Sequence, residues 1–179
     1  MSTIGFDTSN YTTSTAWTDG KTDINVRQIL YVKDGERGIR QSDGVFQHMK
    51  LMPVMYEKLS EQIDFKDVKA VGVSTRPRCV EGSYMPVFLA GEGYAKVVAN
   101  TLGVPLYEFS HQDGHIMAGI YSSGSFELLE NDFISVHLSG GTTEILKSRY
   151  NGFNFDNEIV GGSKDISAGQ FIDRVGVKM

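Results

Sequence analysis

Residues 4–16, IGFDTSNYTTSTA, have the pattern of a strand, a turn of small and hydroxyl residues, and a second strand. The same pattern returns at residues 134–146, ISVHLSGGTTEIL. Laid over each other at a fixed offset, the segments share identical residues at Ile4 and Ile134, Ser9 and Ser139, Thr12 and Thr142, and Thr13 and Thr143. This similarity suggests an internal repeat. The alternative is two unrelated hairpins of ordinary hairpin composition.

The turns of these two hairpins are suited to anion binding. Small residues let backbone N–H groups point outward toward a phosphate, and the hydroxyls of Ser139, Thr142 and Thr143 could add donors. Actin-like and sugar-kinase-like ATPases hold a nucleotide between two ribonuclease-H-like halves with one such hairpin in each half. The similarity of the two hairpins therefore favours a nucleotide-binding protein with two lobes.

The order of elements supports the same fold class. Up to residue 122 the patterns predict three strands, a helix, a strand, a helix, a strand and a helix, which is an antiparallel meander followed by parallel crossovers. The helices are expected at residues 45–59, 87–103 and 111–123, the first with a core stripe of Val45, Met49, Met52, Met55, Tyr56 and Leu59. We expect an α/β ribonuclease-H-like, actin-like ATPase fold.

A second lobe begins after a junction near residue 124. Three strands are expected at residues 132–138, 142–148 and 154–160, followed by a helix whose start Asp165 or Ser167 could cap. The predicted domains are a complete N-terminal lobe, residues 1–124, and the incomplete beginning of a second lobe, residues 125–179. The sequence thus predicts the N-terminal part of a two-lobed protein.

The segment HQDGH, residues 111–115, carries a candidate metal site. His111 and His115 are four residues apart, so on a helix both imidazoles lie on one face, about one turn apart. Two neutral imidazoles at that spacing can hold one transition metal. Two ordinary histidines at the start and flank of a helix are the alternative.

Composition excludes several classes of protein. The net charge of −5 argues against broad non-specific nucleic-acid binding, although Arg37, Arg40, Arg76 and Arg78 are candidates for a local basic patch or, more simply, solvated surface residues. The single cysteine cannot form an internal disulfide, which fits a reducing compartment. Without a signal-peptide pattern or a long apolar run, the chain is predicted to be cytoplasmic and to have no membrane partner.

Four segments, in order, resemble the TsaD/glycoprotease family, once called O-sialoglycoprotein endopeptidases. They are GFDTSNYTTS, SHQDGHIMAG, VHLSGGTTEIL and GGSKDISAGQFIDRVG. The family belongs to the actin-like superfamily, and the resemblance implies a metal-dependent transfer of threonylcarbamoyl from threonylcarbamoyl-adenylate to an adenosine of tRNA. The implied cofactors are one divalent metal, iron or zinc, and ATP or threonylcarbamoyl-adenylate. The older protease label has little support because the sequence lacks HExxH.

The resemblance also assigns roles to single residues. His111 and His115 match the family's metal ligands, and Asp173 matches an aspartate that binds the nucleotide ribose. The implied nucleotide-binding turn consists of His137, Leu138, Ser139, Gly140 and Gly141. The implied partners are a nucleotide and tRNA, with a homodimer or a related actin-like protein of the modification complex as protein partner.

Departures from the family pattern keep two alternatives open. Tyr11 and Thr12 stand where the family usually has an acidic pair, Arg76–Pro77–Arg78 replaces a Gly-Pro-Gly loop, and the family's third metal ligand would lie beyond Met179. Such a chain could be a divergent paralogue acting on another acceptor. It could also be a non-catalytic scaffold protein of the modification complex.

Overall fold

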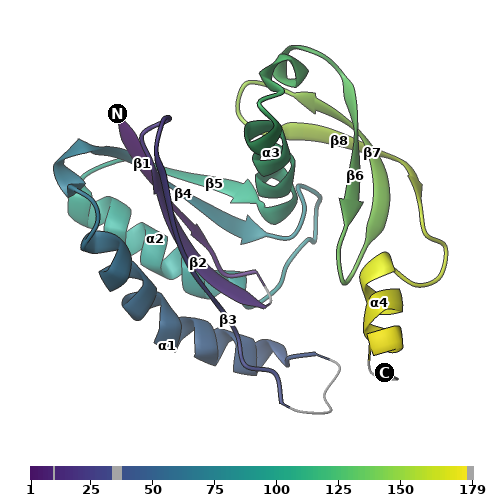
Figure 1. Cartoon of the computed structure of the whole chain (residues 1–179), viewed down its shortest axis with the longest axis horizontal. Coiled ribbons are helices and arrows are strands. Elements are labelled where there is room, and N and C mark those ends of the chain that lie inside the picture. Colours follow the sequence, from purple (N-terminus) through teal and green to yellow (C-terminus); the bar gives the residue numbers. More distant parts are fainter. Residues whose placement is uncertain (10, 34–37, 177–179) are drawn as a thin grey trace. The chain divides into compact units, whose positions relative to one another are not determined.

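The computed structural model describes residues 1–9, 11–33 and 38–176 (Figure 1). It divides into two compact units, Met1–His111 and Gln112–Met179. The lobe boundary expected near residue 124 stays a prediction. Among the described helices, none is both long and apolar enough to cross a membrane.

The first unit is built on a mixed five-stranded sheet in the order β3-β2-β1-β4-β5. The first three strands form the predicted meander, and β4 and β5 run parallel to β1. Ile4 and Phe6 alternate into the core from β1, while β4 is apolar on both faces, as expected of a covered central strand. The strands are β1 Ser2–Asp7, β2 Thr12–Thr18, β3 Asp23–Ile29, β4 Val68–Arg76 and β5 Leu106–Ser110.

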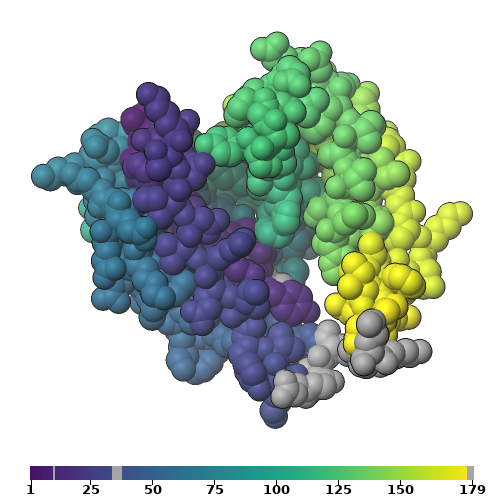
Figure 2. Space-filling view, viewed as in Figure 1, coloured from purple at the N-terminus to yellow at the C-terminus, as the bar shows by residue number. Residues whose placement is uncertain are grey.

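Helix α1, Gln41–Ser60, covers this sheet and begins earlier than predicted. The helix was expected from residue 45, but residues 41–44 already belong to it. Arg37 lies in residues 34–37, outside the described residues. Met52, Met55 and Leu59 are buried as predicted. Met49 does not belong to the core, because it is 48 % exposed. In Figure 2 the residues of α1 are dark blue and reach the visible surface.

Helix α2, Phe88–Leu102, packs beside α1 and against β4. Its end was predicted correctly: Gly103 adopts a left-handed φ of 66°, and the N–H of Val104 donates to the carbonyl of Ala99. A short 3-10 turn, η1 Phe65–Asp67, leads from α1 into β4. Because the two crossover connections keep β1, β4 and β5 parallel, the carboxyl ends of these strands lie at the same edge of the sheet.

The second unit contains a three-stranded antiparallel sheet in the order β6-β7-β8. Helix α3 starts at His111 and contributes Ile116 and Ile120 to a core with Leu146 and Phe155 of the sheet. The elements are α3 His111–Ser123, η2 Phe126–Glu130, β6 Phe133–Leu138, β7 Thr143–Tyr150, β8 Phe155–Gly162 and α4 Ala168–Gly176. The predicted order of strands and helices is confirmed in both units.

Candidate functional site

The parallel strands of the first unit end at one edge of the sheet, and polar residues gather there. Asp7 is the last residue of β1, and His111 directly follows β5. Ligands of open α/β sheets bind outside the carboxyl ends of the strands. This edge is therefore where the first unit can present groups to a ligand.

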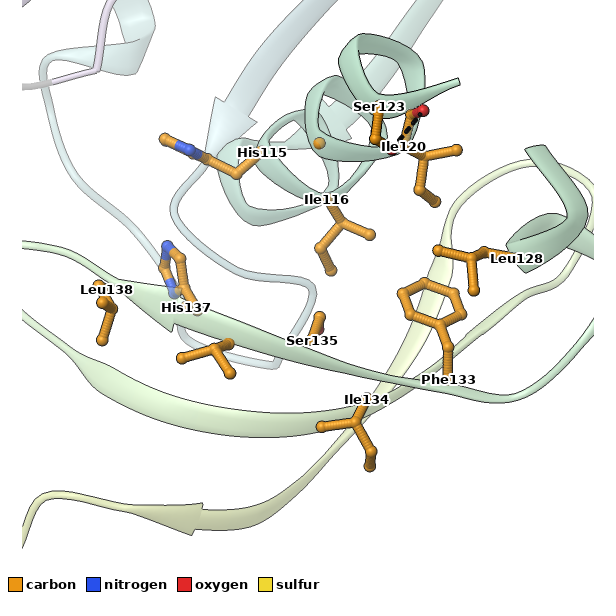
Figure 3. A pocket seen from close by; sticks show the side chains of 12 residues that line it. His115, Ile116, Ile120, Ser123, Leu128, Phe133, Ile134, Ser135, His137 and Leu138 are labelled. Atoms are coloured by element: carbon orange, nitrogen blue, oxygen red, sulfur yellow. Dashed lines mark hydrogen bonds between the residues drawn. The ribbon is translucent and has the colours of Figure 1, made fainter. Parts of the chain in front are cut away.

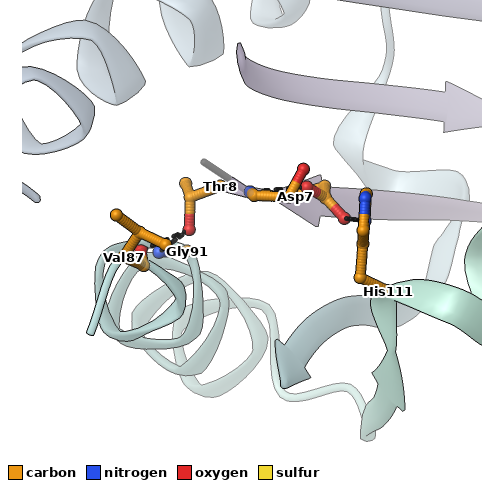
Figure 4. Close-up of polar contacts among 6 residues, drawn as sticks. Asp7, Thr8, Val87, Gly91 and His111 are labelled. Carbon is orange, nitrogen blue, oxygen red and sulfur yellow. Dashed lines mark hydrogen bonds and ion pairs between the residues drawn. The ribbon is translucent and has the colours of Figure 1, made fainter. Parts of the chain in front are cut away.

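Asp7 and His111 are in direct contact although 104 residues separate them (Figure 4). The Oδ2 atom of Asp7 lies 2.8 Å from Nδ1 of His111, and its Oδ1 atom accepts a 2.7 Å bond from the N–H of Ser9. Burial alone would raise the pKa of Asp7, but His111, Ser74 and Ser9 hold it at about 2. The carboxylate is therefore charged at neutral pH and its orientation is fixed.

Thr8 joins this end of β1 to the first turn of α2 (Figure 4). Its hydroxyl donates to the carbonyl of Val87 at 2.8 Å and accepts from the N–H of Gly91 at 3.1 Å. The hydroxyl therefore lies between the carbonyl that precedes the helix and the N–H of Gly91, and it ties the end of β1 to the start of α2. Gly91 allows this approach, because a Cβ there would lie 2.9 Å from the hydroxyl.

His115 is exposed one turn further along α3. Its ring centroid lies 5.7 Å from that of His137 at the end of β6, with the planes tilted by 55°. Both side chains line a hollow of about 370 Å³ between α3 and β6, which Ile116, Ile120, Leu128 and Phe133 make mostly apolar (Figure 3). The two histidines form its polar end.

Hydrogen bonds hold His137 on its other side. Its Nδ1 atom lies 3.3 Å from both the side-chain amide of Gln112 and the hydroxyl of Thr142. The same amide is 3.4 Å from Oε2 of Glu144, the cross-strand neighbour of His137. A polar network thus joins the start of α3 to the β6-β7 hairpin within the second unit.

The turn at residues 138–142 uses hydroxyl and N–H groups for hydrogen bonds within itself. The hydroxyl oxygen of Ser139 accepts from the N–H groups of Gly141 and Thr142, at 3.3 and 3.0 Å, and lies 2.9 Å from the hydroxyl of Thr142. Thr143 uses its hydroxyl to accept from the N–H of Ala168. An anion at this turn would have to compete with these internal bonds.

The start of α4 packs directly on the same turn. The Ser167 hydroxyl donates to the carbonyl of Gly140 at 2.7 Å and accepts from the N–H of Gln170, so it caps the helix as predicted. A Cβ on Gly169 would lie 2.7 Å from the Cα atom of Gly140, so only glycine permits this approach. Asp173 lies within α4 and is exposed.

The histidines of α3 fit part of a metal site. Nδ1 of His111 is in contact with Asp7, so a metal would have to bind this ring through Nε2, and His115 follows one helical turn later. No group of three or more His, Cys, Asp or Glu side chains that could hold a metal occurs in the part of the chain that the structure describes. The two candidate histidines alone are fewer ligands than a closed metal site requires.

Sequence reasoning missed several residues that build this region. Asp7 and Thr8 lie in the first predicted hairpin, but nothing in the neighbouring sequence indicates that they contact α3 and α2. Gln112 and Glu144 follow or face histidines that were singled out, and that adjacency was the available signal. Gly169 was inside a quoted motif, where a glycine near a helix start indicates a close approach.

Comparison with known proteins identifies the family. A family model described as TsaD, tRNA N6-adenosine threonylcarbamoyltransferase, matches residues 36–179. The chain belongs to the TsaD family. The tRNA N6-adenosine threonylcarbamoyltransferase of Christiangramia forsetii is 31 % identical over 126 residues, covering 69 % of this chain and 34 % of the relative. That of Pyrobaculum calidifontis is 28 % identical over 173 residues, covering 95 % and 47 %.

Solved structures confirm the actin-like ATPase fold of this TsaD-family chain. YeaZ from Pseudomonas aeruginosa superposes with a TM-score of 0.51 at 12 % identity, covering 90 % of this chain and 65 % of that one. A second Pseudomonas aeruginosa structure, of an uncharacterized protein similar to YeaZ, gives 0.52 at 10 % identity, covering 88 % and 63 %. Of the two transferases compared above, the chain spans about a third of the Christiangramia forsetii protein and about half of the Pyrobaculum calidifontis protein.

Proposed function

We propose that this chain provides part of the site of a metal-dependent transferase that moves a threonylcarbamoyl group from its adenylate to an adenosine of tRNA. Membership of the TsaD family supports the reaction class. His111 and His115 would be the metal ligands, with iron or zinc as the metal. The residues from His137 to Gly141, together with Asp173, would contact ATP or threonylcarbamoyl-adenylate.

The observation that carries the proposal is the placement of the two histidines. Helix α3 begins with His111, directly after β5, at the edge of the sheet where three parallel strands end. His115 follows one turn later and is exposed. The pair thus lies at a strand-to-helix junction, with His111 partly exposed and His115 exposed, at the edge of the sheet where ligands of open α/β folds bind.

The chain's own residues would mainly bind and orient the reactants. A metal, when bound, would act as a Lewis acid on the carbamoyl carbonyl. Ser139 and Thr142 could turn their hydroxyls from each other toward an adenylate phosphate, releasing the N–H groups of the turn. Asp173 could accept hydrogen bonds from both hydroxyls of a ribose. Such positioning contributes several kcal/mol to lowering a barrier.

A second candidate function is that of a non-catalytic scaffold protein of the modification complex. It is favoured by the turn at residues 138–142, where internal bonds occupy the N–H groups of Gly141 and Thr142. The absence of an acidic pair at Tyr11 and Thr12 points the same way. Such a protein would pair with another actin-like chain, or with its own copy, without needing metal. A transferase acting on a different acceptor would keep the metal and change only the acceptor.

ATP binding in the presence and absence of zinc distinguishes these functions. We expect the wild-type chain to bind ATP more tightly with zinc, and His115→Ala to lose that enhancement. Ser122→Ala, further along the exposed part of α3, is the matched control and should behave like wild type. Binding of a partner chain together with no response to metal in the wild type would overturn the transferase proposal in favour of the scaffold.

A further inference from the structure

We propose that Asp7 is a positioning residue that fixes the imidazole of His111 for a ligand at Nε2. This inference rests on the proposed function, because it assigns to Asp7 a task in the site that His111 and His115 would form. It adds a residue from the first strand to a motif on the third long helix.

The contact between the two side chains has the geometry that such a role needs. Oδ2 of Asp7 is 2.8 Å from Nδ1 of His111, a good distance for a charge-assisted hydrogen bond. Oδ1 is held separately by the N–H of Ser9 at 2.7 Å. Each carboxylate oxygen therefore has its own partner, and the group cannot rotate without losing both bonds.

The backbone that carries Asp7 is also fixed. Asp7 is paired with Ser14 at the end of the β1-β2 hairpin. The next residue, Thr8, is fully buried and bonded to the first turn of α2 through both Val87 and Gly91. The carboxylate thus projects from a rigid point of the sheet, which is what holding a flexible imidazole requires.

An aspartate at this place determines which nitrogen of a neutral His111 carries the proton. A neutral imidazole that donates Nδ1–H to the carboxylate keeps its lone pair on Nε2. The ring of Phe88, with its centroid 6.1 Å from that of His111, restricts the imidazole further. Since the side chains of His111 and Asp7 are only 29 % and 25 % exposed, the pair is largely shielded but still reachable from solvent.

Metal-binding histidines commonly donate their second N–H to a carboxylate, and loss of that partner typically weakens metal binding ten- to a hundredfold. Asp7 fits this outer role better than that of a direct ligand, because both of its oxygens already have partners in the chain. The distinction predicts how conservative variants behave. In the Asp7→Asn variant the amide oxygen could still accept Nδ1–H, whereas the side chain in Asp7→Ala could not.

The test compares zinc affinity and the His111 tautomer in the chain and its variants. Zinc dissociation constants are measured by competition with a chelator, and the tautomer by ¹⁵N-correlated NMR of the imidazole. We expect an Nδ1–H tautomer in the wild type, a loss of zinc affinity of about ten- to a hundredfold in Asp7→Ala, and a smaller loss in Asp7→Asn. Asp67→Ala is the matched control, because Asp67 directly precedes β4 at the end of this strand that lies away from Asp7.

Each outcome bears on one claim. An Nε2–H tautomer in the wild type overturns the role of Asp7, and this measurement needs no variant, so it holds even if Asp7→Ala fails to fold. Zinc binding that depends on His111 and His115 but is unchanged in Asp7→Ala also overturns that role and leaves the proposed function standing. Equal, large losses in both Asp7 variants would make Asp7 a direct ligand and overturn its positioning role. A wild-type chain without zinc affinity overturns the proposed function itself.

Discussion

His48 is fully buried between α1 and β2, where its Nδ1 atom lies 2.7 Å from the hydroxyl of Thr13. Among the described residues its Nε2 atom has no hydrogen-bond partner. Burial lowers the pKa of His48 to about 4, against an attraction from Asp7 that raises it. His48 is therefore neutral in the folded protein at pH 7 and serves the core, whereas the other three histidines are partly or fully exposed.

The depressed pKa of His48 predicts that acid weakens the fold. The unfolded chain binds this proton near pH 6.5 and the folded chain only near 4, so stability is full above 6.5 and is lost as the pH falls toward 4. Between pH 7 and 5 the loss from this group should be on the order of 2 kcal/mol. Urea unfolding of wild type and His48→Gln at both pH values measures it. An equal pH dependence in the two proteins would contradict the assignment.

Gly91 predicts an unusual response to alanine. Within an exposed helix, Gly→Ala stabilises by about 1 kcal/mol, but here the new Cβ would lie 2.9 Å from Thr8 Oγ1, whose bonds prevent it from moving away. We expect Gly91→Ala to destabilise by about 1–3 kcal/mol. Gly93→Ala, in the same helix with open space around it, should be neutral or stabilising. Thermal unfolding compares the two, and equal effects would contradict the Thr8 anchor.

Helix α1 contains a proline, and a side chain of α2 replaces the hydrogen bond that this proline cannot make. Pro53 has no N–H to donate to the carbonyl of Met49, which would be its partner four residues back. The hydroxyl of Tyr94 in α2 donates to that carbonyl at 3.0 Å instead. The two helices are thus joined at the point where the first lacks a hydrogen bond of its own.

This arrangement predicts coupling between Tyr94 and Pro53. Tyr94→Phe should cost about 0.5–1.5 kcal/mol of unfolding free energy in the wild type, because the Met49 carbonyl then loses its donor. In a Pro53→Ala background the restored N–H can take its place, so the cost should shrink. A double-mutant cycle by urea unfolding measures the difference. Equal costs in both backgrounds would show that the two residues act independently.

The sequence indicated most elements because their signals are local. Alternation in β1, the apolar run of β4 and the glycine that ends α2 are all readable within a few residues. The start of α1 was missed because QSDG, residues 41–44, has the composition of a turn, and here tertiary packing outweighs that preference. The contact of Asp7 with His111 could not be predicted, since it depends on β1 and β5 ending at the same edge of a sheet.

As a whole, the chain is a TsaD-family protein with the histidine motif, the Ser-Gly-Gly turn and the start of α4 in place. It spans 34 % of the Christiangramia forsetii relative and 47 % of the Pyrobaculum calidifontis relative. Two histidines provide fewer ligands than catalytic metal sites usually have. The central claim is that His111 and His115, with Asp7 orienting His111, are enough to retain a metal.

Metal content tests this claim most directly. The purified chain is loaded with zinc or iron, freed of excess metal, and measured by elemental analysis beside a His111→Ala, His115→Ala double variant. We predict close to one metal per chain in the wild type and almost none in the double variant, with both proteins equally folded by circular dichroism. No retained metal in the wild type, or equal retention in the variant, would contradict the claim.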